Sequence, residues 1–228
     1  MTVVVKDNGF GIKNVIIDEP KTYNSLSFKT LNILIDVFKR LEKDNKTRVI
    51  IVSGNGKGFS AGHNLKEVKN LKVRSKYLKL FNLCSKLMLN IVEGRKPVIA
   101  KVHGSAFAAG CQLAASCDLA YASTDAKFAT PGVNIGLFCS TPMVAVSRKI
   151  GKKRMMKMLL TGEPINARNA KEIGLINDCF PKKKLNSKVL EVAKVISAKS
   201  NLSIKIGKKA FYKPVSYTHL TLPTKRIV

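Results

Sequence analysis

The sequence predicts a layered α/β domain built around mostly parallel strands. Apolar segments with strand character alternate with amphipathic helical segments in the order ββα, βα, βα, and this order requires crossover connections between strands. The chain has 228 residues, of which 45% are hydrophobic, so it can bury a substantial core. We expect one domain over residues 1–213 and an atypical segment over residues 214–228.

The chain begins with a predicted hairpin followed by a helix. Two segments within residues 2–18 alternate in hydrophobicity on either side of Asn8-Gly9, which is a strong turn signal. Over residues 26–41 apolar side chains recur at helical spacing, which predicts a helix with Ser25 or Ser27 as its N-cap.

A buried strand and a long helix are predicted next. Residues 48–53, RVIIVS, have the unbroken apolar centre of a strand that is covered on both faces. Glycines and serines then mark a loop over residues 54–65. Residues 74–92 carry the apolar stripe of an amphipathic helix, and Gly94 stands at its C-cap.

Residues 96–123 read as a strand, a turn of small residues and a helix. The strand 97–102 leads through Gly104–Gly110 into a second apolar segment that begins at Cys111. A helix that starts after such a turn leaves backbone N–H groups unpaired at its first turn. We therefore expect a binding site made of backbone groups, followed by another strand over residues 119–122.

Helices dominate the prediction for the last part of the chain. Residues 128–142 are interrupted by glycine and proline and show no clear periodicity. Beyond them we expect helices over 142–149, 153–160, 167–173 with Asn166 as cap and Gly174 as stop, 185–198 and 202–212, and a strand over 175–180.

Lysine accounts for most of the net charge of +27, because 33 Lys stand against 8 Arg. The lysines are scattered over the predicted surface segments, only 7% of residues are aromatic, and Trp is absent. These features argue against a nucleic-acid-binding protein. Lys182–Lys184 is the only dense run, and we predict a solvated turn there. We interpret the excess of lysine as a general feature of the surface composition. It would also favour the binding of a polyanionic small molecule.

The five cysteines are odd in number and show neither CxxC nor Cys/His spacing, which predicts reduced, buried thiols and no metal site. No apolar run reaches the roughly 18 residues of a membrane-spanning helix. The N-terminus alternates like a strand and does not resemble a signal or transit peptide. We expect a cytoplasmic protein; a mitochondrial location would require a targeting segment that is missing from this copy.

Three segments, in order, match a known pattern. FSAGHNLKE at 59–67, the stretch 96–123, and FATPGVNIG at 128–136 with LLTGEPINARNAKEIGLIN at 159–177 resemble the enoyl-CoA hydratase/isomerase, or crotonase, superfamily. The resemblance covers roughly residues 3–213, and the wording AAGCQL, SCD, FATPGVN and GLFCSTP is similar to that of one subgroup. It implies a spiral of ββα units that binds an acyl-CoA.

The resemblance also implies an oxyanion hole made of two backbone N–H groups. On the matching positions these belong to His63, which follows FSAG, and to Ala109, the middle residue of three small residues at 108–110. A thioester that becomes an enolate needs donors fixed before the charge develops, and each is worth about 3 kcal/mol of barrier. Small residues at Ala106, Ala108 and Gly110 would let a ligand approach the backbone, although tight helix packing alone would also explain them.

Histidine side chains are assigned no catalytic role. The motif places the backbone N–H of His63 in the site, so we do not expect its imidazole to act in acid–base chemistry. His103 ends an apolar strand, where we expect a structural hydrogen bond, and His219 lies in the atypical tail.

The sequence departs from the family at both acids of the hydration reaction. In hydratases of this family two glutamates hold the water that is added, whereas Gln112 and Gly132 stand at these positions here. An amide transfers no proton at neutral pH and glycine has no side chain, so glutamate-based hydration is not available.

Other groups were considered as replacements for the glutamates. Carboxylates occur nearby at Glu67, Asp118 and Asp125, and we expect Asp118 to be structural. Cys139, Ser140 and Thr141 stand together as nucleophile candidates, but no His or carboxylate partner is identifiable for them.

For the CoA part of the ligand, the resemblance suggests a substrate-binding set made of Lys21, Ala61, Asn64, Leu65 and Gly110. Asn64 replaces the aspartate that often stands in this loop. No cofactor is expected besides the CoA thioester, which is the substrate.

Three functions remain open from the sequence. The first is an enzyme, a lyase or isomerase of fatty acid or acyl-CoA metabolism that acts on an unsaturated or enolisable acyl-CoA. The second is a non-catalytic acyl-CoA-binding or regulatory protein, and the third is an RNA-binding relative. Family members finish with further helices that cover the pocket and build trimers or dimers of trimers. Here we expect a truncated helical region, with a foreign end favoured over a genuine extended arm after Lys213.

Overall fold

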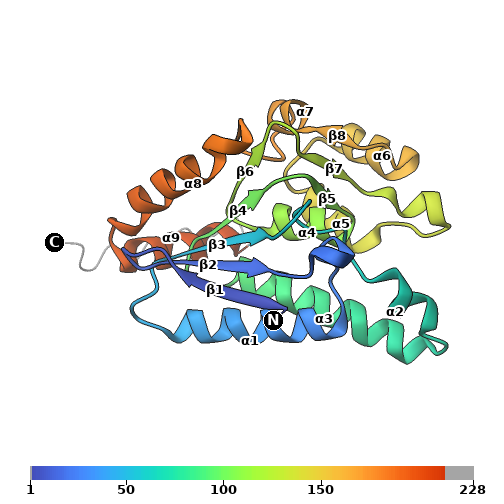
Figure 1. Cartoon of the computed structure of the whole chain (residues 1–228), viewed down its shortest axis with the longest axis horizontal. Helices are drawn as coiled ribbons and strands as arrows, with labels where there is room; N and C mark the ends of the chain where they lie inside the picture. The colour runs from blue at the N-terminus through green and yellow to red at the C-terminus, as the bar shows by residue number, and fades with distance from the viewer. Residues whose placement is uncertain (1, 214–228) are drawn as a thin grey trace, which may run out of the picture.

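A computed structural model describes residues 2–213, and it consists of two sheets surrounded by helices (Figure 1). The larger sheet has the strand order β1-β2-β3-β4-β6-β9, and the smaller one has the order β5-β7-β8. In the larger sheet β1 and β2 form an antiparallel hairpin, and every later pair is parallel. The predicted α/β class is confirmed.

The strands and helices have the following bounds. The strands are β1 (Val3–Asp7), β2 (Ile12–Ile17), β3 (Val49–Gly54), β4 (Val98–Val102), β5 (Ser105–Phe107), β6 (Leu119–Ser123), β7 (Lys127–Ala129), β8 (Ile165–Asn166) and β9 (Asp178–Phe180). The α-helices are α1 (Phe28–Lys43), α2 (Leu65–Asn70), α3 (Arg74–Val92), α4 (Ala109–Ser116), α5 (Ser140–Val146), α6 (Lys152–Thr161), α7 (Ala167–Glu172), α8 (Lys182–Ser197) and α9 (Asn201–Tyr212). Two 3₁₀ turns cover Pro20–Thr22 and Pro131–Ile135.

The chain passes repeatedly from the larger sheet to the smaller one and then into a helix. Strand β4 leads to β5 and α4, and β6 leads to β7 and the helices that follow. In the preceding turn β3 leads to Ser60, which forms a bridge with Ala106 of β5 before α2 and α3 begin. These turns are the ββα spiral that the resemblance implied.

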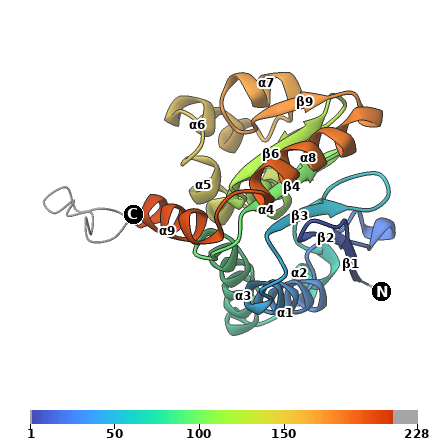
Figure 2. The same ribbon diagram turned by 90° about the vertical axis from the view of Figure 1, so that its left-hand side faces the viewer.

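The larger sheet is covered on both faces, as Figures 1 and 2 show. On one side α1 and α3 pack together over a core that includes Leu34, Val52 and Leu87. On the other side α8 covers a separate cluster in which Leu185 and Val189 meet the sheet. Burial on both faces explains why the predicted strand over 48–53 is apolar throughout.

Most predicted elements are confirmed, and the differences concern short ones. Ser27 is the N-cap of α1 and accepts a hydrogen bond of 3.0 Å from the Thr30 N–H. The sequence did not indicate α2 or the strands β5, β7 and β8, which have between two and six residues. Elements this short show no readable periodicity. The lysine run 182–184, predicted as a turn, is the exposed first turn of α8.

Helix α9 is held to the rest of the molecule by a buried lysine. The Lys208 ammonium donates to the carbonyl oxygens of Ile91 and Lys96, at 2.9 and 2.8 Å, and to Asp118 Oδ2 at 2.6 Å. Asp118 Oδ2 also accepts a hydrogen bond from the Val98 N–H at 2.7 Å. The structural role expected for Asp118 is therefore confirmed.

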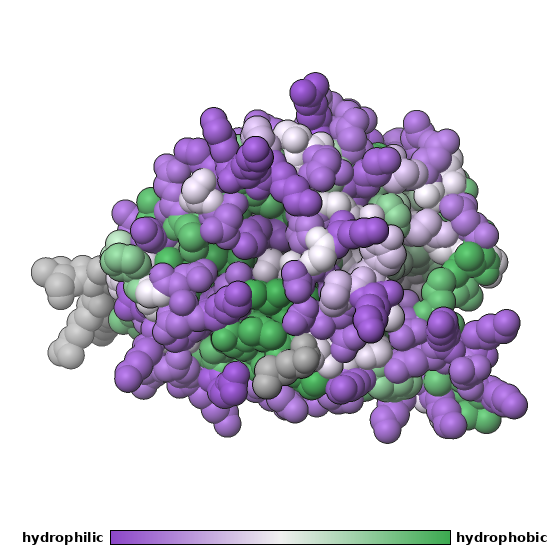
Figure 3. Space-filling view, in the orientation of Figure 1, coloured by the Kyte–Doolittle hydropathy of each residue, from purple (hydrophilic) through white to green (hydrophobic). Residues whose placement is uncertain are grey.

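The face of the molecule shown in Figure 3 is mainly hydrophilic, with hydrophobic groups between the polar side chains. Within residues 2–213 no helix is long and apolar enough to cross a membrane. All five cysteines are free, and four of them are buried, as predicted. His103 Nε2 donates a hydrogen bond to the Gly56 carbonyl oxygen at 2.9 Å, in agreement with its structural role. The predicted tail and His219 lie outside the described residues.

Candidate active site

The loop that follows β3 is joined to β5 by backbone hydrogen bonds. Phe59 N–H and Ser60 N–H both donate to the Ser105 carbonyl oxygen at 3.0 Å, and Phe107 N–H donates to the Ser60 carbonyl oxygen at 2.9 Å. Ser60 Oγ in turn donates to the Asn24 carbonyl oxygen at 2.9 Å. This network places the FSAG segment beside the turn that leads into α4.

Two residues in the left-handed region of φ stand directly before the expected oxyanion donors. Gly62, with φ +90°, precedes His63, and Ala108, with φ +47°, precedes Ala109. For a residue with a Cβ this conformation costs roughly 1–3 kcal/mol, and such strain often accompanies function. A Cβ added to Gly62 would lie only 3.0 Å from the Ala109 nitrogen, so the two loops are in contact.

The two backbone N–H groups have no internal partner. Within residues 2–213, neither the His63 N–H nor the Ala109 N–H donates a hydrogen bond to a protein acceptor. Ala109 is also the first residue of α4, whose helix dipole is positive at this end. The two N–H groups can therefore donate hydrogen bonds to an oxygen that carries negative charge.

Gly110 has a packing role at the corner that residues 59–63 form with the start of α4. A Cβ at this position would lie 2.1 Å from the Ser60 carbonyl oxygen, which is far below any real contact. The helix can approach the FSAG loop only because residue 110 lacks a side chain.

The His63 imidazole is largely buried and packs against Leu26 and Phe81. Its Nδ1 lies 3.3 Å from the Leu26 carbonyl oxygen, and its ring makes an edge contact with Phe81 at 5.5 Å between centroids. Nε2 is buried without a hydrogen-bond partner among the described residues. Burial lowers the pKa of His63, and the bond to Leu26 only partly offsets this, so the folded state favours the neutral ring.

Gln112 and Gly132 both lie inside the protein. Gln112 is 5% exposed, and its Oε1 lies 3.9 Å from Cys84 Sγ. Gly132 donates its N–H to Cys139 Sγ at 3.3 Å, and a Cβ there would lie 2.8 Å from the Leu137 carbonyl oxygen and 2.9 Å from that sulfur. The backbone around Gly132 thus leaves no room for a glutamate.

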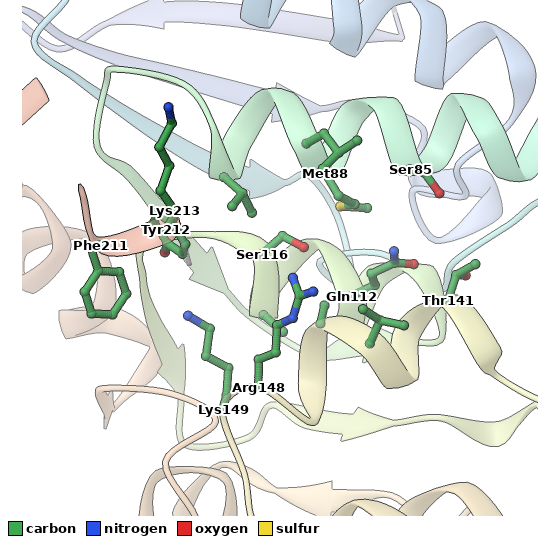
Figure 4. Close-up of a pocket in the computed structure, with 15 residues that line it drawn as sticks. Ser85, Met88, Gln112, Ser116, Thr141, Arg148, Lys149, Phe211, Tyr212 and Lys213 are labelled. Carbon is green, nitrogen blue, oxygen red and sulfur yellow. The ribbon is translucent and has the colours of Figure 1, made fainter. Parts of the chain in front are cut away.

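A pocket of about 630 Å³ opens beside Gln112 (Figure 4). It lies along α4, between α3 on one side and α5 on the other, and it ends at α9. Its walls are largely apolar, and its polar lining comes from Ser85, Gln112, Ser116, Thr141, Arg148, Lys149, Tyr212 and Lys213.

The replacement groups considered from sequence do not supply an acid to this pocket. Glu67 Oε2 accepts a hydrogen bond from the Phe28 N–H at 3.0 Å, Asp118 binds Lys208, and Asp125 is exposed on a turn. No Asp or Glu is among the described residues that line the pocket. Burial raises the pKa of the Cys139 thiol, so it is not a thiolate at neutral pH.

The residues expected to bind CoA lie in or beside the loop that contains the FSAG segment. Lys21, Ala61 and Leu65 are exposed, and the Ala61 N–H donates to the Tyr23 carbonyl oxygen at 2.9 Å. Asn64 is the N-cap of α2, because its side chain accepts from the N–H groups of Lys66 and Glu67. Asn64 thus has a local role at the start of the helix.

Sequence reasoning missed Cys84, Arg148 and Lys149 as neighbours of the site. Cys84 faces Gln112 from α3, and the two cations reach the pocket from the segment after α5. Their positions depend on how three helices meet, and a cationic pair carried little information in a chain with 33 lysines.

The fold and this corner agree with comparisons to known proteins. The sequence pattern of the enoyl-CoA hydratase/isomerase family matches residues 7–226. This chain belongs to that family.

Among its relatives is the mitochondrial enoyl-CoA hydratase domain-containing protein 3 of Mus musculus. The two are 44% identical over 204 residues, which are 89% of this chain and 68% of that protein. The solved structure of human enoyl-CoA hydratase domain-containing protein 3 is similar, with a TM-score of 0.90 and 42% identity over 93% of this chain and 83% of the other. An enoyl-CoA hydratase from Mycobacterium smegmatis gives a TM-score of 0.91 and 42% identity over 93% of this chain and 82% of the other. The crotonase fold and the subgroup indicated by the motif wording are confirmed.

The relatives correct one prediction. The names of the mouse, human and rat relatives each describe a mitochondrial protein. The expected cytoplasmic location is therefore wrong. It was based on an N-terminus that reads as a strand, and β1 indeed begins at Val3, but the start of a fold says nothing about the compartment.

Proposed function

We propose that this chain binds an acyl-CoA thioester and holds its carbonyl oxygen with the backbone N–H groups of His63 and Ala109. The observation that carries the proposal is that each N–H follows a left-handed residue and donates to no acceptor within residues 2–213. A carbonyl oxygen gains negative charge as an enolate forms, and a donor fixed in advance lowers that barrier by about 3 kcal/mol. The dipole of α4 adds to the same field.

The chemistry that fits this site is enolate stabilisation and not hydration through two glutamates. Gln112 cannot exchange a proton at neutral pH, and the packing around Gly132 excludes a longer side chain. As an enzyme, the chain would be a lyase or isomerase of fatty acid or acyl-CoA metabolism. The acyl group would enter the pocket beside Gln112, and the CoA would lie over Lys21, Ala61, Asn64 and Leu65.

Exchange of the α-protons of butyryl-CoA in D₂O tests this proposal directly. Ala109→Pro removes one donor at the first position of a helix, where proline is tolerated. We expect exchange to fall by about a hundredfold in this variant. The matched control is Lys152→Pro, because Lys152 is exposed and is the first residue of α6. If Ala109→Pro keeps the wild-type rate and the native circular dichroism spectrum, the oxyanion role is refuted.

A second candidate is a non-catalytic acyl-CoA-binding protein, and the lack of a carboxylate in the described pocket lining favours it. Calorimetric binding of butyryl-CoA without any α-proton exchange would support this function over catalysis. Crotonyl-CoA hydration should stay at the uncatalysed rate, and Gln112→Glu alone should not raise it, because the second acid is still missing. Substantial hydration by the wild-type chain would show that the reaction does not need those acids.

RNA binding is the third candidate, and scattered lysines and few aromatic residues weigh against it. A titration with single-stranded RNA at increasing salt would discriminate. We expect binding to vanish by about 200 mM salt, and tight binding that persists there would replace the acyl-CoA proposal.

We also propose that the protein assembles as a homotrimer or as a hexamer when its native C-terminus is present. Large hydrophobic side chains are half exposed on the loop after Gly132, at Ile135, Leu137 and Phe138, and such groups are suited to contact another protein surface. Sedimentation equilibrium would test the stoichiometry, and a monomer at micromolar concentration would contradict it.

A further inference from the structure

The pocket beside Gln112 runs along α4, whose first residue, Ala109, carries one of the two expected oxyanion donors. Gln112 follows Ala109 by one helical turn, and Ser116 lines the pocket one turn further on. At 1.5 Å per residue, the path from Ala109 to Ser116 is about 10 Å long. A chain that starts at the oxyanion corner therefore points toward the end of the pocket formed by α9.

That far end is cationic. Arg148 and Lys149, just after α5, and Lys213, just after α9, line it, and no described lining residue is acidic. Figure 4 shows the Arg148 and Lys149 side chains reaching into the pocket from below α4. Neither side chain forms an ion pair or a side-chain hydrogen bond with another residue in the range 2–213.

The carboxylate of Asp118 does not neutralise these cations. Asp118 lies on the other side of Tyr212, in a second cavity, and its Oδ2 already accepts hydrogen bonds from Lys208 and from the Val98 N–H. The Lys149 ammonium instead lies 5.8 Å from the centre of the Tyr212 ring. The charges of Arg148 and Lys149 are therefore left for a ligand.

The walls between the two ends are apolar. Met88, Leu89 and Val92 come from α3, and Val144 comes from α5. A phosphate or a nucleotide would gain nothing from such walls, whereas methylene groups would be removed from water. The complementary ligand thus has a polar group at the corner, an apolar middle and an anion at its far end.

We infer that this pocket selects acyl thioesters whose acyl chain ends in a carboxylate, and that Arg148 and Lys149 bind this carboxylate. The inference rests on the proposed function, because the thioester must occupy the corner formed by His63 and Ala109. A guanidinium binds a carboxylate through two parallel hydrogen bonds, and a flanking apolar surface strengthens the attraction.

The test compares hexanoyl-CoA with adipoyl-CoA by isothermal titration calorimetry on the full chain. The two ligands have the same number of acyl carbons and differ in the terminal carboxylate. We expect adipoyl-CoA to bind at least about tenfold more tightly. In the double variant Arg148→Gln, Lys149→Gln, this preference should disappear.

The matched control is the double variant Lys153→Gln, Arg154→Gln. It removes the same charge from two exposed neighbouring residues of α6 that do not line this pocket, and it should keep the preference. Equal binding of the two ligands by the wild type would overturn the inference. A preference that survives in Arg148→Gln, Lys149→Gln would overturn it as well. If neither thioester binds, the proposed function itself fails.

Discussion

The two ends of the candidate site are built from different material. The corner formed by residues 59–63 and the start of α4 is made of backbone groups. These groups are hydrogen-bonded to β5, or they approach one another closely where a glycine lacks a side chain. The α9 end is made of long side chains, including Arg148 and a Phe211 that is 78% exposed. Backbone geometry changes little with most substitutions, whereas side chains can be exchanged singly. We therefore propose that the corner sets the reaction type and that the α9 end selects the acyl group.

The largest effect should come from adding a single methyl group to the corner. Gly110→Ala places a Cβ 2.1 Å from the Ser60 carbonyl oxygen, so α4 must move away from the FSAG loop. We expect the free energy of unfolding to fall by about 3 kcal/mol or more, measured with guanidinium chloride.

The control for this change lies at the other end of the site. Gly207→Ala in α9 meets nothing within 4 Å, so it should stabilise the protein by about 0.5–1 kcal/mol. If the two variants had similar stability, the corner would not be more tightly constrained than the α9 end.

A somewhat smaller effect is expected from releasing α9. Lys208→Met leaves Asp118 without its ammonium partner and removes two hydrogen bonds to carbonyl oxygens. The Lys208 side chain is only 7% exposed, so the loss should be about 3 kcal/mol in chemical unfolding. Faster proteolysis near residue 201 should accompany it.

An exposed ion pair serves as the comparison for Lys208. Lys188 and Glu191 are 46% and 64% exposed, so Lys188→Met should change stability by less than about 0.5 kcal/mol. An equal effect of the two substitutions would show that α9 is not anchored by burial of its lysine.

The alkylation rates of the cysteines provide a chemical test of how tightly the corner is packed. Burial raises the pKa of Cys84 and of Cys111 to about 12, so both thiols beside the site should resist alkylation in the native protein. Cys179 is only partly buried and should react first with iodoacetamide at pH 8, as mass spectrometry of the peptides would show. Early labelling of Cys84 would mean that the corner opens readily.

The smallest effect concerns pH. Burial lowers the pKa of His63 in the folded state, so below its ordinary value of 6.5 the unfolded chain binds a proton that the folded chain does not. Folding stability should therefore fall as the pH drops through 6.5. His63→Gln should lose less stability than the wild type between about pH 7.5 and 5.5 in thermal unfolding. Identical losses would contradict the burial of the neutral ring.

The sequence predicted the long elements well. The helix over 74–92, the hairpin around Gly9 and the Asn166 cap of α7 follow from local rules and are confirmed. The role of the His63 and Ala109 N–H groups stays a prediction, as does the domain boundary at residue 213. The short strands β5 and β7 could not be predicted, because their pairing depends on segments far apart in the chain.

The sequence by itself determined the α/β class, the family motifs and the presence of Gln112 and Gly132, because each depends on which residue stands at which position. Only the tertiary structure decided that Gly132 leaves no space for a glutamate and that Arg148 and Lys149 face the far end of the pocket. These facts concern distances between helices and loops that are brought together by folding. Their cause is the packing of α4 against its neighbours, which no local pattern of residues records.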